Sequence, residues 1–119
     1  MEVCCAAQTL EAFARGESVW RDLNRRARRA QIERMIELTD ELYPTFRWSL
    51  YDGQSHFSVP VTLFGPRRAV VYVGQLYFVF NITDHIRVLT AHFDRLVKEA
   101  VTQPTDMPAF LLKLLREVR

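Results

Sequence analysis

The stretch VVYVGQLYFVF, residues 70–80, constrains the fold of this chain more than any other feature. It is apolar almost throughout, and only Gly74-Gln75 interrupts it. Its flanks are rich in β-branched and aromatic residues, which favour strands over helices. A two-residue loop that begins with glycine is typical of a type II′ hairpin. We therefore predict two antiparallel strands over 69–73 and 76–80, each apolar on both faces and covered on both sides.

Two further strands are predicted ahead of this hairpin. Apolar and polar residues alternate over 46–51 and again over 57–63, as they do in strands with one buried face. Asp52-Gly53 predicts a turn between them, because glycine tolerates positive φ. Pro60 lacks an amide donor, so it favours an edge or a bulge for the second strand. Together with the hairpin, these segments predict a four-stranded antiparallel meander.

Helical periodicity predicts two helices before the strands and two after them. Glycine and proline mark their ends, and side chains with a hydroxyl or amide group mark their starts. The last helix is apolar around most of its circumference, which is typical of a buried helix or an association surface. The predicted fold is therefore α+β, a single domain over 1–119 with the meander flanked by two N-terminal and two C-terminal helices. The helices cover 6–15 up to Gly16, Ser18 to Pro44, Asn81 or Thr83 to 100, and 108–118.

Composition favours a soluble cytoplasmic protein. Apolar residues make up 49% of the chain and charged residues 25%, values typical of globular proteins. No run approaches the roughly 20 apolar residues of a membrane helix. The start of the chain lacks the basic and apolar segments of a signal peptide. Cys4 and Cys5 are neighbours, which indicates two reduced thiols rather than a disulfide framework.

The sequence predicts no catalytic, metal or cofactor site. His85 and His92 are seven residues apart, whereas a helical metal pair needs a spacing of three or four. The chain has neither a G-x-S-x-G motif nor a glycine-rich phosphate loop. No pair of carboxylates has an evident partner in a cleft.

An arginine cluster is the most distinctive polar feature. Residues 15–34 hold seven arginines against three acidic residues, a local charge of +4. A solvated helix face, a contact with nucleic acid phosphates and a contact with an acidic protein partner all remain open as interpretations. The arginines on the side of the helix away from its apolar residues are Arg21, Arg25, Arg28 and Arg29.

Three segments, 64–74, 77–80 and 85–94, carry a resemblance to a known family. With the helix ending over 93–100, they resemble the C-terminal effector portion of small bacterial helix-turn-helix transcription regulators. The resemblance covers roughly residues 44–110, and the helices before residue 44 have no tight recognition turn. It implies a regulatory, non-enzymatic role and supplies no binding residues.

The leading hypothesis is a non-enzymatic regulatory domain in bacterial transcriptional control. It would sense a small ligand or bind a protein partner, and it would act as a homodimer. We expect Leu111, Leu112 and Leu115 of the last helix to contribute to the dimer contact. Nucleic acid binding through the arginine-rich helix is the second choice, and a small enzyme with a site assembled from scattered residues is the third.

Overall fold

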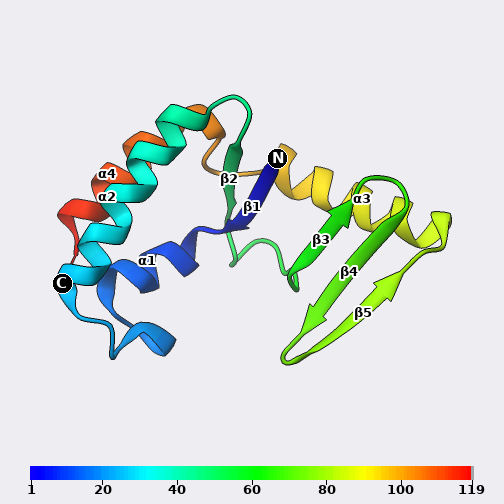
Figure 1. Ribbon diagram of the computed structural model, residues 1–119, viewed down its shortest axis with the longest axis horizontal. Helices are drawn as coiled ribbons and strands as arrows, with labels where there is room; N and C mark the ends of the chain where they lie inside the picture. Colours follow the sequence, from blue (N-terminus) through cyan, green and yellow to red (C-terminus); the bar gives the residue numbers. More distant parts are fainter. Residues whose placement is uncertain (119) are drawn as a thin grey trace.

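The computed structural model describes residues 1–118 of the chain. Its strands and helices form two halves that meet at a small parallel sheet (Figure 1). The elements in chain order are β1 (Glu2–Ala6), α1 (Ala7–Arg15), the 3₁₀ turn η1 (Ser18–Trp20), α2 (Arg25–Leu42), β2 (Arg47–Tyr51), β3 (Val61–Phe64), β4 (Arg68–Val73), β5 (Leu76–Phe80), α3 (Thr83–Lys98), the 3₁₀ turn η2 (Pro104–Asp106) and α4 (Met107–Arg116).

The helical half consists of α1, α2 and α4, and it contains the main hydrophobic core (Figure 1). Its four largest fully buried apolar side chains come from three separate elements of the chain: Ile32, Leu50, Met107 and Leu111. Leu50 belongs to β2, so the parallel sheet packs against the same core as the helices. The last helix, predicted over 108–118, is apolar because α4 contributes side chains to this core.

The ends of the helices follow local backbone chemistry. Gly16 ends α1 with a φ of 67°, as the glycine stop predicts. Pro44 ends the second helix, as predicted, because Tyr43 before it is extended. The predicted start at Ser18 is wrong: Ser18 has a φ of 57°, whereas an N-cap needs extended geometry. The cap is instead Asn24, whose Oδ1 accepts a hydrogen bond of 2.8 Å from the amide of Ala27.

The sheet differs from the prediction. The four-stranded antiparallel meander is wrong, because the strands form two separate sheets. In the first, β1 pairs in parallel with β2, with Glu2 opposite Arg47 and Ala6 opposite Tyr51. In the second, β3, β4 and β5 form an antiparallel meander of three strands.

The loop over 52–60 explains why β2 and β3 do not pair. One carboxylate oxygen of Asp52 accepts hydrogen bonds from the Gln54 amide at 2.9 Å and from the Gln8 side chain at 2.8 Å. The other accepts one from the Ser55 hydroxyl at 3.1 Å. These bonds fold the segment after β2 against the start of α1 instead of turning it into a hairpin. The predicted strand over 57–63 consequently shortens to Val61–Phe64.

The predicted hairpin is confirmed. Val73 is opposite Leu76, Gly74 has a φ of 60°, and Gln75 has no positive φ, which matches a type II′ turn. The prediction that both strands are covered on both sides is wrong. β4 lies in the middle of its sheet, but β5 is an edge strand.

Helix α3 connects the two sheets. It packs on β1 and β2 of the parallel sheet and on β3 and β4 of the antiparallel sheet. In Figure 1 it runs behind the antiparallel sheet and reaches the N-terminal end of β1. Both sheets therefore share one helix as support. Ile82 occupies the N-cap position of α3. The predicted side-chain cap by Asn81 or Thr83 is absent from this position.

Candidate functional site

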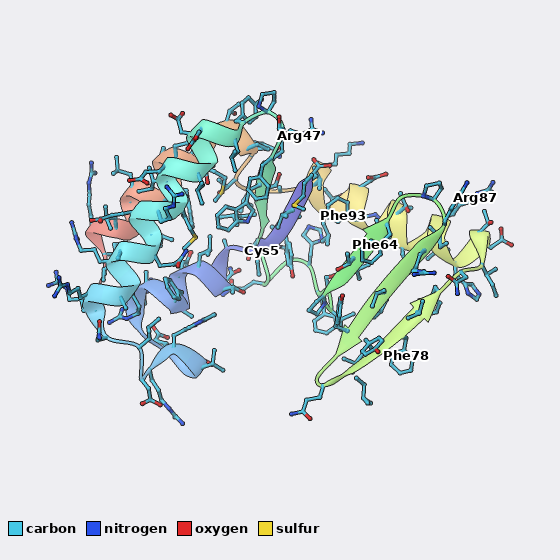
Figure 2. All side chains as sticks on the ribbon, viewed as in Figure 1. Cys5, Arg47, Phe64, Phe78, Arg87 and Phe93 are labelled. Atoms are coloured by element: carbon cyan, nitrogen blue, oxygen red, sulfur yellow. The ribbon has the colours of Figure 1, made fainter. Side chains whose placement is uncertain are left out.

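The β4–β5 hairpin carries the largest group of exposed apolar side chains. In β5, Leu76 is 66% exposed, Tyr77 67%, Phe78 53% and Val79 48%. Successive residues of a strand point to opposite faces of the sheet, so both faces of β5 are uncovered. Figure 2 shows Phe78 on β5, at the outer side of the antiparallel sheet, across β4 from β3. We call Tyr72, Val73, Leu76, Tyr77, Phe78 and Val79 the hairpin surface.

More apolar side chains are exposed around the hairpin surface. Phe64 at the end of β3, Ile82 after β5 and Val88 on α3 are each more than half exposed. A shallow apolar depression lies beside them, lined by Phe80, His85, Val88 and Leu89. Apolar patches of this kind usually mark contacts with another molecule.

The structure separates the four arginines of the predicted contact face. Arg21, Arg25 and Arg29 are exposed, whereas Arg28 is buried with only 6% of its surface accessible. The Arg28 guanidinium donates hydrogen bonds to the carbonyl oxygen of Ala14 and, at 3.0 Å, to that of Leu23. Arg28 therefore joins α1 to α2, and three of the four arginines are exposed to solvent.

Arg29 is partly engaged within the chain. Its Nε lies 3.4 Å from a carboxylate oxygen of Glu33, and its Nη1 donates to the carbonyl of Leu115 at 3.3 Å. The electrostatic character of the arginine face is therefore weaker than the sequence count indicates.

The three leucines predicted to contribute to a dimer do not share a surface. Leu111 is fully buried in the core, and Leu115 packs partly against it. Leu112 is 44% exposed. The apolar circumference of α4 is thus largely occupied within the chain, and the sequence reasoning did not identify the exposed residues of β5. The sequence signal for these exposed residues is the absence of any charged residue between Leu76 and Phe80. One neighbouring helix cannot cover both faces of such a strand.

A cleft lies between the two sheets. It has a volume of about 600 Å³ and is walled by residues 1–4 on one side and residues 61–64 on the other. Its floor includes His92, Phe93 and Leu96 of α3. In Figure 2, Phe93 lies between β1, which carries Cys5, and β3, which carries Phe64. We call this site the β1–β3 cleft.

Apart from the carboxylate of Glu2, the polar side chains of the β1–β3 cleft are neutral or hydrogen-bonded within the chain. Burial, together with neighbouring Cys5 and Glu2, raises the pKa of the Cys4 thiol to about 11, so Cys4 is protonated at neutral pH. A protonated thiol is a weak nucleophile. The imidazole Nε2 of His92 lies 2.9 Å from the hydroxyl oxygen of Ser58, and no carboxylate among residues 1–118 hydrogen-bonds to the ring. The Ser58–His92 pair therefore lacks the third group that orients a catalytic base.

Cys5 lies outside the cleft and is also held in its thiol form. Burial raises its pKa, although the indole Nε1 of Trp48 donates a hydrogen bond of 3.3 Å to its sulfur. Within residues 1–118, no three His, Cys, Asp or Glu side chains are placed to hold a metal ion. In the same part of the chain, no helix is long and apolar enough to cross a membrane.

Comparisons with protein-family models, with curated proteins and with solved structures find no match to this chain.

Proposed function

We propose that this protein is a non-enzymatic interaction domain that forms a homodimer through the hairpin surface and acts in bacterial transcriptional control. The observation that carries the proposal is the exposure of β5 on both faces and along its free edge. The regulatory role rests on the resemblance of residues 44–110 to the effector portion of bacterial transcription regulators.

The free edge of β5 favours a strand as the contacting element. An edge strand presents unpaired backbone N–H and C=O groups to any strand that approaches. Proteins usually protect such edges with charged residues or proline. β5 has neither between Leu76 and Phe80, so its edge lacks both of these protections.

The chemistry of β5 fits a second copy of itself. Two β5 strands that pair antiparallel about a two-fold axis bring no like charges together, because the strand is uncharged. A register centred on Phe78 would place Tyr77 opposite Val79 of the partner subunit. Pairs of aromatic and β-branched side chains stabilise antiparallel sheets. The resulting contact uses the same patch on both subunits, as two-fold symmetry requires.

The exposed area is compatible with a dimer. At about 150–250 Å² for a large side chain, the exposed parts of the hairpin surface add up to roughly several hundred Å². A standard interface buries about 800 Å² on each partner. Together with Ile82, the hairpin surface supplies a large part of the area that such an interface buries.

Sedimentation velocity on the full chain at micromolar concentration tests the proposal. We expect a dimer for the native chain and a monomer for Phe78→Lys, because the charge would be buried at the two-fold axis. Val19→Lys is the matched control, since Val19 is 81% exposed and lies in η1, outside the hairpin surface. The control should remain a dimer.

A monomeric native chain contradicts the proposal. A native dimer that Phe78→Lys leaves intact contradicts the assignment of the interface to β5. Circular dichroism melting of both variants shows whether they are folded, and Phe78→Lys should fold because its side chain is already more than half exposed.

A further inference from the structure

The two walls of the β1–β3 cleft are strand edges. The cleft is lined by four consecutive residues of each segment, 1–4 and 61–64. Consecutive residues of a strand point to opposite faces, so a cavity that contacts all of them runs along the edge of the strand. Within residues 1–118, β1 pairs only with β2, and β3 pairs only with β4. Both strands therefore turn a free edge towards the cleft.

The two edges lie on a common support. Helix α3 packs against both β1 and β3, and its residues form the floor between them. Figure 1 shows the two strands running in opposite directions on either side of the gap. A strand placed there would pair antiparallel with one neighbour and in parallel with the other, an arrangement that mixed sheets commonly contain.

We propose that the β1–β3 cleft binds an extended, uncharged apolar peptide segment of a partner protein, which adds a strand between β1 and β3 and joins the two sheets into one six-stranded layer. An extended backbone offers donors and acceptors along both of its edges, and these match the two free edges of the cleft. A third extended backbone can therefore hydrogen-bond to the N–H and C=O groups of both edges at once.

The side chains of the cleft define the chemistry of the segment. Seven of the lining residues are apolar: Met1, Val3, Val61, Leu63, Phe64, Phe93 and Leu96. The thiol of Cys4 is neutral, and His92 is paired with Ser58. Glu2 carries the one carboxylate of the lining, and the ammonium group of Met1 donates a hydrogen bond to the carbonyl of Thr45 at 2.9 Å. An uncharged segment rich in β-branched residues suits this lining.

The lengths of the walls set the length of the segment. β1 has five residues and β3 has four, so at most four residues of the peptide can pair on both sides. The segment must have both edges free. This requirement excludes β5 of a second copy, because β5 is already paired with β4. The cleft is therefore separate from the surface that we propose for the homodimer.

Selection from a displayed library of linear peptides against the full chain tests this inference. We expect enriched peptides to share a core of about four uncharged, β-branched or aromatic residues without proline, the number that the shorter wall allows. The most enriched peptide, labelled with a fluorophore, is then measured by fluorescence anisotropy. Methylation of alternate backbone nitrogens, which keeps the side chains but removes donors, should weaken its binding by about tenfold or more.

Two variants assign the binding to the cleft. Leu63→Arg places a long charged side chain in the cleft and should abolish binding of the peptide. Phe78→Lys, on the hairpin surface, should bind the peptide as the native chain does. Sedimentation of Leu63→Arg should still give the oligomeric state of the native chain, which separates this inference from the proposed dimer.

Three results would overturn the inference. They are a library that yields no enriched peptide, a peptide whose affinity survives backbone methylation, and a peptide that binds Leu63→Arg equally well. Native mass spectrometry provides a further check. A co-purified small molecule that Leu63→Arg releases would assign the cleft to a small ligand instead.

Discussion

The helical half and the hairpin half place similar apolar residues in opposite environments. In the helical half, apolar side chains from β2, α2 and α4 converge on one core, and Ile32, Leu50 and Met107 have no accessible surface. In the hairpin half, most of β5 is exposed although it is equally apolar. The difference is the number of elements available for cover. Three helices surround the first core, whereas α3 is the helix that packs on the antiparallel sheet.

This contrast shows that apolar content does not by itself mark a core. Burial of a large apolar side chain stabilises a fold by about 1.5–3 kcal/mol, but only where another element of the chain provides the cover. Without that element, the same residue stays exposed and is available for contact with another molecule. Four predictions test the contrast, from the largest expected effect to the smallest.

Leu111→Ala should destabilise the chain by about 2–5 kcal/mol, because it leaves a cavity in the core of the helical half. Phe78→Ala should change the stability of the monomer by less than about 1 kcal/mol, although it removes a larger side chain. Urea denaturation monitored by circular dichroism, at a concentration where the chain is monomeric, measures both. Equal losses would end the distinction between the two halves.

Arg28→Met should cost about 2–3 kcal/mol, because it leaves the carbonyls of Ala14 and Leu23 without their charged donor. Arg25→Met is the matched control on the same helix and should shift stability by less than about 0.5 kcal/mol. The same denaturation curves give the answer. If Arg28→Met leaves the free energy of unfolding unchanged, the hydrogen bonds of Arg28 to Ala14 and Leu23 do not hold α1 against α2, and the structural role assigned to Arg28 is wrong.

Gly74→Val should destabilise the hairpin half by about 1–3 kcal/mol, because a β-branched residue is strained at the positive φ of this position. A Cβ at position 74 has no neighbouring atom within 4 Å, so the expected loss comes from backbone strain rather than from a clash at Cβ. Gln75→Val, one residue further on and without positive φ, is the control and should be nearly neutral. An unchanged denaturation midpoint for Gly74→Val would contradict the type II′ turn.

Asp52 should give the smallest effect, a dependence of stability on acid pH. Hydrogen bonds from the amide of Gln54 and the side chain of Gln8 lower the pKa of this carboxyl below 3.8 in the folded chain. Its stabilising contribution is therefore present above about pH 4 and is lost as the pH falls through the lowered value. Urea midpoints at pH 7 and pH 3 should fall less for Asp52→Asn than for the native chain. Equal falls would show that the bonds of Asp52 do not contribute to the loop between the halves.

Features fixed by neighbouring residues could be predicted from the sequence. The type II′ hairpin, the end of α1 at Gly16 and the end of α2 before Pro44 depend on the φ preferences of single residues. The positions of the helices follow from apolar periodicity, which local segments carry in full. Ser18 was misleading because a serine that looks like a cap sits in a turn with positive φ.

Pairing between distant strands could not be predicted in the same way. The segment EVCCA does not alternate clearly between polar and apolar residues, and its partner, β2, begins more than forty residues later. A strand prediction for 46–51 was compatible with either neighbour, and the hydrogen bonds of Asp52 decide between them. The β1–β3 cleft exists because β2 pairs with β1 and not with β3. In a four-stranded meander β3 would pair with β2, and its edge would not face β1.

The burial of the candidate contact residues could not be predicted either, because it also depends on distant parts of the chain. Arg28 and Arg29 are neighbours with the same side chain, yet one is buried between helices and the other is exposed. Only the packing of α1 against α2 distinguishes them. The apolar face of α4 likewise has the composition of an interface, and the position of Leu111 in the core becomes evident only when its neighbours from other elements are known.

The parallel pairing of β1 with β2 has a consequence for the order of folding. The β4–β5 hairpin closes over two residues, and such hairpins form in about 1–10 μs. β1 has to wait until residues 47–51 are available, and closing a loop of that length carries a larger entropic cost. The first strand along the chain is therefore expected to be among the last to pair. During folding, the hairpin surface is available to a second chain before the β1–β3 cleft exists, so assembly would precede completion of the peptide site.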